Sequence, residues 1–120
     1  MYEIDVYKDA RGNSPIQIFI DDLEQKAPTD KRAARLLKKL FYSVELLKNS
    51  GTRSGEQFTK QIDGKLWELR PDDHRVFFFM WNGNHIVLLH SFRKSGRKTP
   101  DLEIKQAKRE MLDWISRHGY

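Results

Sequence analysis

The chain has 120 residues, the usual size of one domain, and its hydrophobic fraction of 38% is enough to close a single core. The absence of cysteine excludes a disulfide framework and thiol chemistry. No apolar run approaches the roughly 18–20 residues that a membrane span needs, and the charged N-terminus lacks the apolar core of a signal peptide. We therefore expect one cytoplasmic, soluble domain over residues 1–120.

The net charge is +5, and residues 51–100 carry 9 basic and 5 acidic residues, which is +4 of that excess. A local cluster of one sign is what a polyanion-binding site requires. A solvated basic turn is the alternative interpretation of the same charges.

The first half of the chain predicts one strand and two helices. Residues 2–6 alternate between apolar and charged side chains, which predicts a strand with one buried face. A helix then begins with Ser14 as its N-cap and Pro15 at its first position, and Gln17 completes a capping box with Ser14. A second helix, capped by Thr29 or Asp30, runs to about residue 48.

From residue 58 onward the pattern changes to period two and predicts a meander of strands over 58–62, 66–70, 75–81 and 85–92. Asp63-Gly64 predicts a type I′ hairpin, and the nearly continuous apolar run of residues 75–81 predicts a central strand. A basic loop over residues 93–99 leads to a last helix that Thr99 caps. The predicted fold class is α+β, with helices packed on an antiparallel sheet.

The sequence lacks the patterns of several common catalytic sites. It has no Gly-x-Ser-x-Gly elbow and no phosphate-binding glycine-rich loop. The histidines lack tight metal-ligand spacing, and His85 and His90 lie five residues apart on one strand, which predicts opposite faces. We therefore expect neither a metal nor a cofactor.

Cations gather where neighbouring strands of the predicted meander end. Arg70 ends one strand, Arg75 begins the next, and Arg93 and Lys94 follow the last. Neighbouring antiparallel strands lie only about 5 Å apart, so these cations are expected to converge. Cations that hold phosphates beside aromatic rings that stack unpaired bases suit single-stranded RNA. The expected RNA-binding residues are Arg97, Lys98, Trp67 and Phe92, with His90 nearby.

A ribonuclease without a metal uses the RNA 2′-OH as its nucleophile. The enzyme then needs a base for that proton, cations for the phosphorane charge, and an acid for the leaving 5′ oxygen. Arginine stabilises charge only, because its pKa exceeds about 12, whereas burial and cationic neighbours convert lysine into an acid. The candidates are Arg70 and Arg75 as charge stabilisers, Lys94 or Lys98 as acid, and Glu56 or His90 as base.

Four motifs give the sequence a family resemblance. They span Lys60–Arg70, Arg75–Phe79, Leu88–Lys94 and Lys98–Ala107. They are similar to the "K-x-x-x-G-x-x-E-L-R", "Y-R-V-F-Y", "L-L-H-x-F-x-K-K" and "K-T-P-x-x-E-I-x-x-A" patterns of one family. The chain thus resembles the HigB branch of the RelE/ParE toxin superfamily, also described as phage-derived toxin-like proteins. Over residues 1–57 the resemblance is only topological.

The resemblance implies a microbial RNase fold and cleavage of mRNA in the ribosomal A site. It also implies inhibition by a helix-turn-helix antitoxin of the HigA kind, through which alone the toxin meets operator DNA. Arg75 matches the superfamily's phosphate-stabilising arginine, and Arg93 and Lys94 match its catalytic positions near the end of the last strand. Glu56 lies eight residues before Gly64, where one branch places a glutamate base.

The sequence departs from the superfamily at the frequent terminal tyrosine or histidine, where it has Lys94-Ser95. Two other functions fit the same resemblance. One is a DNA gyrase inhibitor of the ParE type, which shares the fold without being a nuclease. The other is a catalytically inactive module that only binds its antitoxin, in which the cations contact acidic antitoxin residues.

Overall fold

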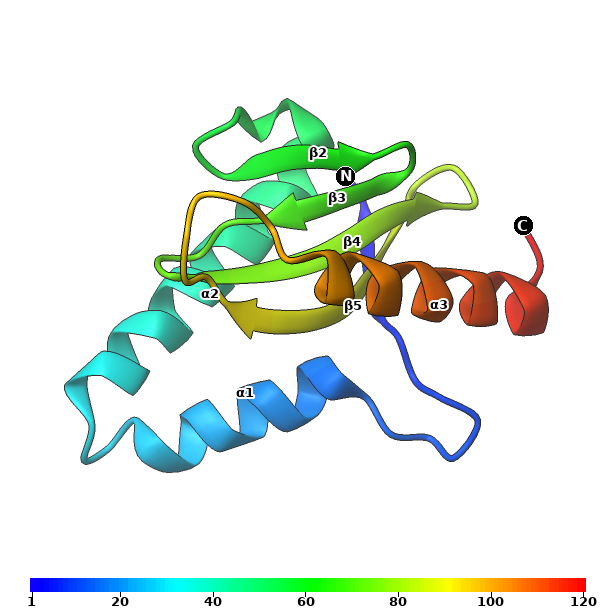
Figure 1. Cartoon of the computed structure of the whole chain (residues 1–120). Helices are drawn as coiled ribbons and strands as arrows, with labels where there is room; N and C mark the ends of the chain where they lie inside the picture. Colours follow the sequence, from blue (N-terminus) through cyan, green and yellow to red (C-terminus); the bar gives the residue numbers. More distant parts are fainter.

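The computed structural model describes residues 1–120, in which three α-helices pack around one five-stranded sheet (Figure 1). The elements are β1 (Glu3–Val6), α1 (Pro15–Lys26), α2 (Lys31–Ser50), a 3-10 turn η1 (Gly51–Ser54), β2 (Thr59–Asp63), β3 (Leu66–Leu69), β4 (His74–Trp81), β5 (His85–Arg93) and α3 (Asp101–His118). The strand order is β1-β5-β4-β3-β2. This arrangement confirms the α+β class. None of the helices has the length and hydrophobicity needed to cross a membrane.

The sheet separates two hydrophobic cores. The helices α1 and α2 cover one face and α3 covers the other, with β4 at the centre of the sheet (Figure 1). Side chains of β4 alternate between the cores: Val76 and Phe78 point to α1 and α2, and Phe77 and Phe79 point to α3. Fully burying one such side chain stabilises the fold by about 1.5–3 kcal/mol. The predicted central strand with two covered faces is confirmed.

The sheet combines local and distant pairings. β2, β3, β4 and β5 form the predicted antiparallel meander, whereas β1 pairs in parallel with β5. The hairpin between β2 and β3 forms, but only Gly64 has a positive φ, of 57°. Asp63 stays in β2, so the type I′ turn predicted at Asp63-Gly64 is wrong. A β-bulge between Gln61 and Asp63 contributes to the reversal of chain direction between β2 and β3.

Side-chain caps start the first two helices. The Ser14 hydroxyl accepts the main-chain N–H of Gln17 at 3.2 Å, as predicted. The Gln17 side chain donates instead to Asp21 at 2.9 Å, so the capping box is only half formed. Asp30, not Thr29, caps α2.

The cap predicted for the last helix is also different. The N-cap position of α3 is Pro100, which has no side-chain hydrogen bond, rather than Thr99. The Thr99 hydroxyl is buried and donates instead to the carboxylate of Glu68 on β3. A buried carboxylate needs a protein donor because water cannot reach it, whereas the main-chain N–H groups at an exposed helix start can donate to water.

His85 and His90 lie on the same face of the sheet, which contradicts the prediction from their spacing. His90 contacts Glu103 and Glu110 of α3, and the His85 ring lies 5.4 Å from Trp81, which packs on Trp114 of α3. The cause is a β-bulge, in which the single residue of β4 between Val76 and Phe78 faces two residues of β5, Leu89 and His90. A bulge inserts one residue and thereby shifts the alternation of side chains.

Candidate active site

Cations converge on the α3 face of the sheet. Figure 1 shows the loop of residues 94–100 on this face, where it leads into α3. Glu68 of β3 lies opposite Phe77, and Arg75 of β4 lies opposite Phe92, in a register that places both on this face. Arg70 follows β3 with the same orientation as Glu68, because side chains two residues apart in extended backbone share a face. We call Arg70, Arg75 and Lys94, together with the carboxylate of Glu68 that lies among them, the cation cluster.

Glu68 is the centre of the cation cluster. Its side chain is 0% exposed, and its Oε2 lies 3.6 Å from Arg70 Nε and 3.7 Å from Arg75 Nε. Its Oε1 accepts the Thr99 hydroxyl at 3.1 Å. Oε2 itself has no hydrogen-bond partner, because both guanidinium contacts exceed hydrogen-bond distance. The carboxylate therefore holds its neighbours by charge.

The two arginines are fixed by main-chain oxygens. Arg75 donates to the carbonyls of Asp72 at 3.0 Å and His74 at 2.7 Å. Arg70 donates to the carbonyl of Glu56 at 2.9 Å. Burial, together with the charge of Arg70, lowers the pKa of Arg75. An arginine starts from a pKa above about 12, so Arg75 remains cationic and serves as a fixed positive charge.

Lys94 has the electrostatics of a proton donor. Burial lowers the pKa of its ammonium group, and the positive charges of Arg75, Arg70 and Lys60 lower it further, while Glu68 opposes them. Its main-chain N–H donates to the Asp73 carbonyl at 2.7 Å, which fixes the chain where β5 ends. A lysine with a lowered pKa releases its proton nearer to neutral pH than an ordinary lysine.

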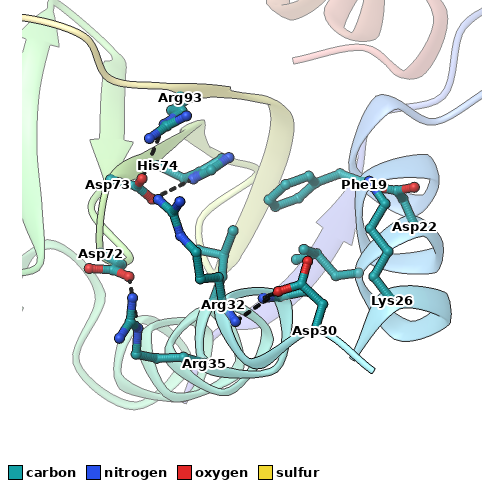
Figure 2. Close-up of a pocket in the computed structure, with 13 residues that line it drawn as sticks. Phe19, Asp22, Lys26, Asp30, Arg32, Arg35, Asp72, Asp73, His74 and Arg93 are labelled. Carbon is teal, nitrogen blue, oxygen red and sulfur yellow. Dashed lines mark hydrogen bonds and ion pairs between the residues drawn. The ribbon is translucent and has the colours of Figure 1, made fainter. Parts of the chain in front are cut away.

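Arg93 points to the opposite face of the sheet. Its Nε lies 3.2 Å from Asp73 Oδ2, and its side chain is 64% exposed. Figure 2 shows it with Asp73 and His74 above the α2 residues Arg32 and Arg35, across from Phe19 of α1. These residues line a cavity of about 370 Å³ in which acidic and basic side chains are balanced. The structure thus separates Arg93 from Arg70, Arg75 and Lys94.

His90 is enclosed between β5 and α3. Its Nδ1 lies 2.6 Å from Glu110 Oε1 and its Nε2 lies 2.9 Å from Glu103 Oε1. Burial lowers the pKa of the imidazole, but the hydrogen bonds and charges of Glu110 and Glu103 outweigh burial and raise the pKa overall. An imidazole whose two nitrogens are both bonded to glutamates has no free nitrogen to accept a proton from a substrate.

The remaining residues predicted for RNA occupy separate environments. Trp67 packs on the α1 and α2 side, with its ring 6.5 Å from that of Phe78. Phe92 is buried against Phe77 on the α3 side. Arg97 and Lys98 are exposed in the loop before α3 and form no ion pair.

Sequence reasoning missed two participants. The alternation predicts that Glu68 pairs across strands with a base, and Arg75 of β4 is such a partner, but the pattern indicated neither the complete burial of Glu68 nor a role for Lys60. In the structure Lys60 of β2 lies directly opposite Glu68 of β3, and its charge acts on Lys94. The sequence does contain a signal for the pairing of Lys60 with Glu68, because the predicted hairpin at Gly64 places residues 60 and 68 opposite each other.

The structure defines the class of the protein as an α+β fold with a cation cluster at one end of an antiparallel sheet. One chain of the "YoeB-YefM complex from Staphylococcus aureus" is similar, with a TM-score of 0.50 and 15% identity over 79% of this chain and 99% of that one. None of the curated proteins compared with the chain matches it. Residues 21–112 match the family described as "Phage derived protein Gp49-like (DUF891)", and the chain belongs to this family.

Proposed function

We propose that this protein is the toxin of a type II toxin–antitoxin system, of the HigB branch, and that it cleaves mRNA on the ribosome without a metal. The motifs within residues 58–110 support the assignment, and so do the family membership and the fold shared with a chain of the YoeB–YefM complex. The observation that carries the proposal is the convergence of Arg70, Arg75 and Lys94 around one buried carboxylate.

The chemistry follows from what each group of the cation cluster is able to do. The RNA 2′-oxygen attacks the adjacent phosphorus, the P–O5′ bond breaks, and a 2′,3′-cyclic phosphate and a free 5′-hydroxyl result. Arg75 and Arg70 offset the charge that develops on the phosphorane oxygens. Lys94 transfers its proton to the leaving 5′ oxygen, as its lowered pKa favours.

Glu56 is the proposed base for the 2′-OH proton. Its main-chain carbonyl is bonded to Arg70, so the residue lies beside the cation cluster, and its side chain is exposed to an incoming RNA. His90 is left out of proton transfer, because both ring nitrogens are bonded to glutamates. Arg93 lies at the end of β5 on the opposite face of the sheet, so it contributes positive charge without contacting the reacting phosphate.

The proposed partners are an mRNA in the ribosomal A site and a cognate helix-turn-helix antitoxin of the HigA kind. Arg97 and Lys98 extend the positive surface from the cation cluster along the loop before α3, where phosphates of a bound RNA are held. We place this action in the cytoplasm, where translation occurs. The antitoxin carries the complex to operator DNA.

The test compares Arg75→Ala with Arg109→Ala, which removes an exposed, unpaired arginine of α3. Each variant is expressed from an inducible promoter, growth is followed, and 5′ ends of transcripts are mapped. We expect growth arrest and new 5′-hydroxyl ends with wild type and Arg109→Ala, and loss of both with Arg75→Ala. Circular dichroism checks that each variant is folded.

Two results would overturn the proposal. One is a folded Arg75→Ala variant that cuts mRNA at the wild-type rate. The other is growth arrest without new RNA ends, accompanied by loss of supercoiling by purified gyrase, which would identify a gyrase inhibitor. An absence of toxicity in every variant would favour a module that only binds its antitoxin.

A further inference from the structure

The buried carboxylate at the centre of the cation cluster has no direct path to a substrate. Glu68 is completely buried, below two arginines and the hydroxyl of Thr99. A carboxylate removed from water is costly to the fold unless its charge and its lone pairs are matched. Here the match is incomplete, because Glu68 Oε2 and Arg75 Nε are both buried without a hydrogen-bond partner. Pairing for stability alone would favour a closer contact.

We propose that Glu68 is the positioning residue of the cation cluster: it holds Arg70 and Arg75 toward the scissile phosphate and ties the 94–100 loop, with Lys94, to the sheet. This inference rests on the proposed function, because it assigns a task within the same site. Arg70, Arg75 and Lys94 repel one another, and a single negative charge beneath them offsets that repulsion.

The geometry supports three separate tasks for one side chain. Oε2 lies almost equally far from both guanidinium groups, at 3.6 and 3.7 Å, so neither arginine is bound tightly enough to be withheld from RNA. Oε1 accepts Thr99 at 3.1 Å and thereby anchors the loop that carries Lys94. The charge of Glu68 also acts on Lys94, against the charges of Arg75, Arg70 and Lys60.

These tasks predict different results for two substitutions. Glu68→Gln keeps the shape and removes the charge. Without that charge the pKa of Lys94 falls further, and the alkaline limb of the pH–rate profile moves down by about one unit. Glu68→Asp keeps the charge but withdraws it by one methylene, so the pH profile stays close to wild type. RNA binding weakens about tenfold, because the arginines and the loop are no longer held.

The experiment measures three quantities for wild type, Glu68→Gln, Glu68→Asp and the control Glu45→Gln, which removes an exposed carboxylate of α2. The first is the pKa of Lys94, followed by NMR of the ammonium group. The second is the Kd for a short single-stranded RNA whose reactive 2′-OH is replaced by hydrogen. The third is the pH profile of mRNA cleavage on ribosomes, with kcat and KM separated.

A lower Lys94 pKa in Glu68→Gln, with wild-type values in Glu45→Gln, would support the assignment. An unchanged Lys94 pKa in a folded Glu68→Gln variant would overturn it. Should Glu68→Gln not fold, Glu68→Asp decides, because a wild-type Kd for RNA in that variant would equally overturn the positioning role. The NMR measurement needs no cleavage, so failure of the nuclease proposal and failure of this one are distinguishable.

Discussion

The histidine between two glutamates makes stability depend on pH in a defined direction. His90 is buried, and its bonds to Glu110 and Glu103 raise its pKa in the folded protein. A group with a raised folded pKa contributes stability in full below its unfolded pKa of about 6.5, and that contribution is lost as the pH rises through the folded value. We therefore expect the protein to lose stability from near neutral to alkaline pH, by about 1.4 kcal/mol for each unit of the shift.

The substitution His90→Gln tests the origin of this dependence. It leaves Glu110, which is only 7% exposed, without a cation, and breaking a buried pair in this way costs about 3–5 kcal/mol. Typical domains have a total stability of only about 5–15 kcal/mol. Thermal unfolding at pH 6 should therefore show a Tm lower by roughly 10 °C than that of wild type.

The difference between wild type and His90→Gln should shrink as the pH rises above about 6.5 and passes through the raised pKa of His90, because wild type then loses its own imidazolium charge. The control is His118→Gln, which removes an exposed histidine of α3. It should keep the wild-type dependence on pH. Parallel stability curves for wild type and His90→Gln from pH 6 into the alkaline range would refute the reasoning.

Three further outcomes follow from single contacts. Asp30→Ala removes the N-cap of α2 and should lower the free energy of unfolding by about 1 kcal/mol, measured by urea denaturation; an unchanged midpoint would contradict the cap. Gly51→Ala should lower the free energy of unfolding by about 1–3 kcal/mol through its φ of 58° alone. The loss should be larger because the added Cβ would lie 2.8 Å from the Tyr2 ring. Adding Tyr2→Ala should relieve this steric contact but not the backbone strain. The double substitution of Arg97 and Lys98 by alanine should reduce the salt dependence of RNA binding without changing the chemical step, and an unchanged slope of log K against log salt would place RNA elsewhere.

The sequence predicted local structure well where the signal is itself local. The apolar run of β4, the turn after Arg70 and the Ser14 cap each depend on a few neighbouring residues, and each is confirmed. Two of the errors arose where a distant partner decided. The bulge that turns His90 toward α3 depends on the pairing of β4 with β5, and Thr99 left its expected cap for a carboxylate 31 residues earlier.

The same distinction applies to the candidate site. Arg70 and Arg75 share a face because they flank one turn between adjacent strands, which spacing alone predicts. Arg93 and Lys94 were expected together, yet consecutive residues in extended backbone point to opposite faces, and Arg93 pairs with Asp73 on the other side. The central place of Glu68 could not be predicted, because it depends on Thr99 and the loop closing over it.

The parallel pairing of β1 with β5 sets the order in which the molecule is completed during synthesis. Residues 3–6 leave the ribosome first, but their partners are residues 85–88, near the end of the chain. The helices α1 and α2 are likewise made before the strands that cover their apolar sides. A nascent chain that stops before residue 85 therefore has no partner for β1, and one that stops before residue 94 lacks Lys94. The cation cluster is therefore complete only after the last quarter of the polypeptide has been synthesised.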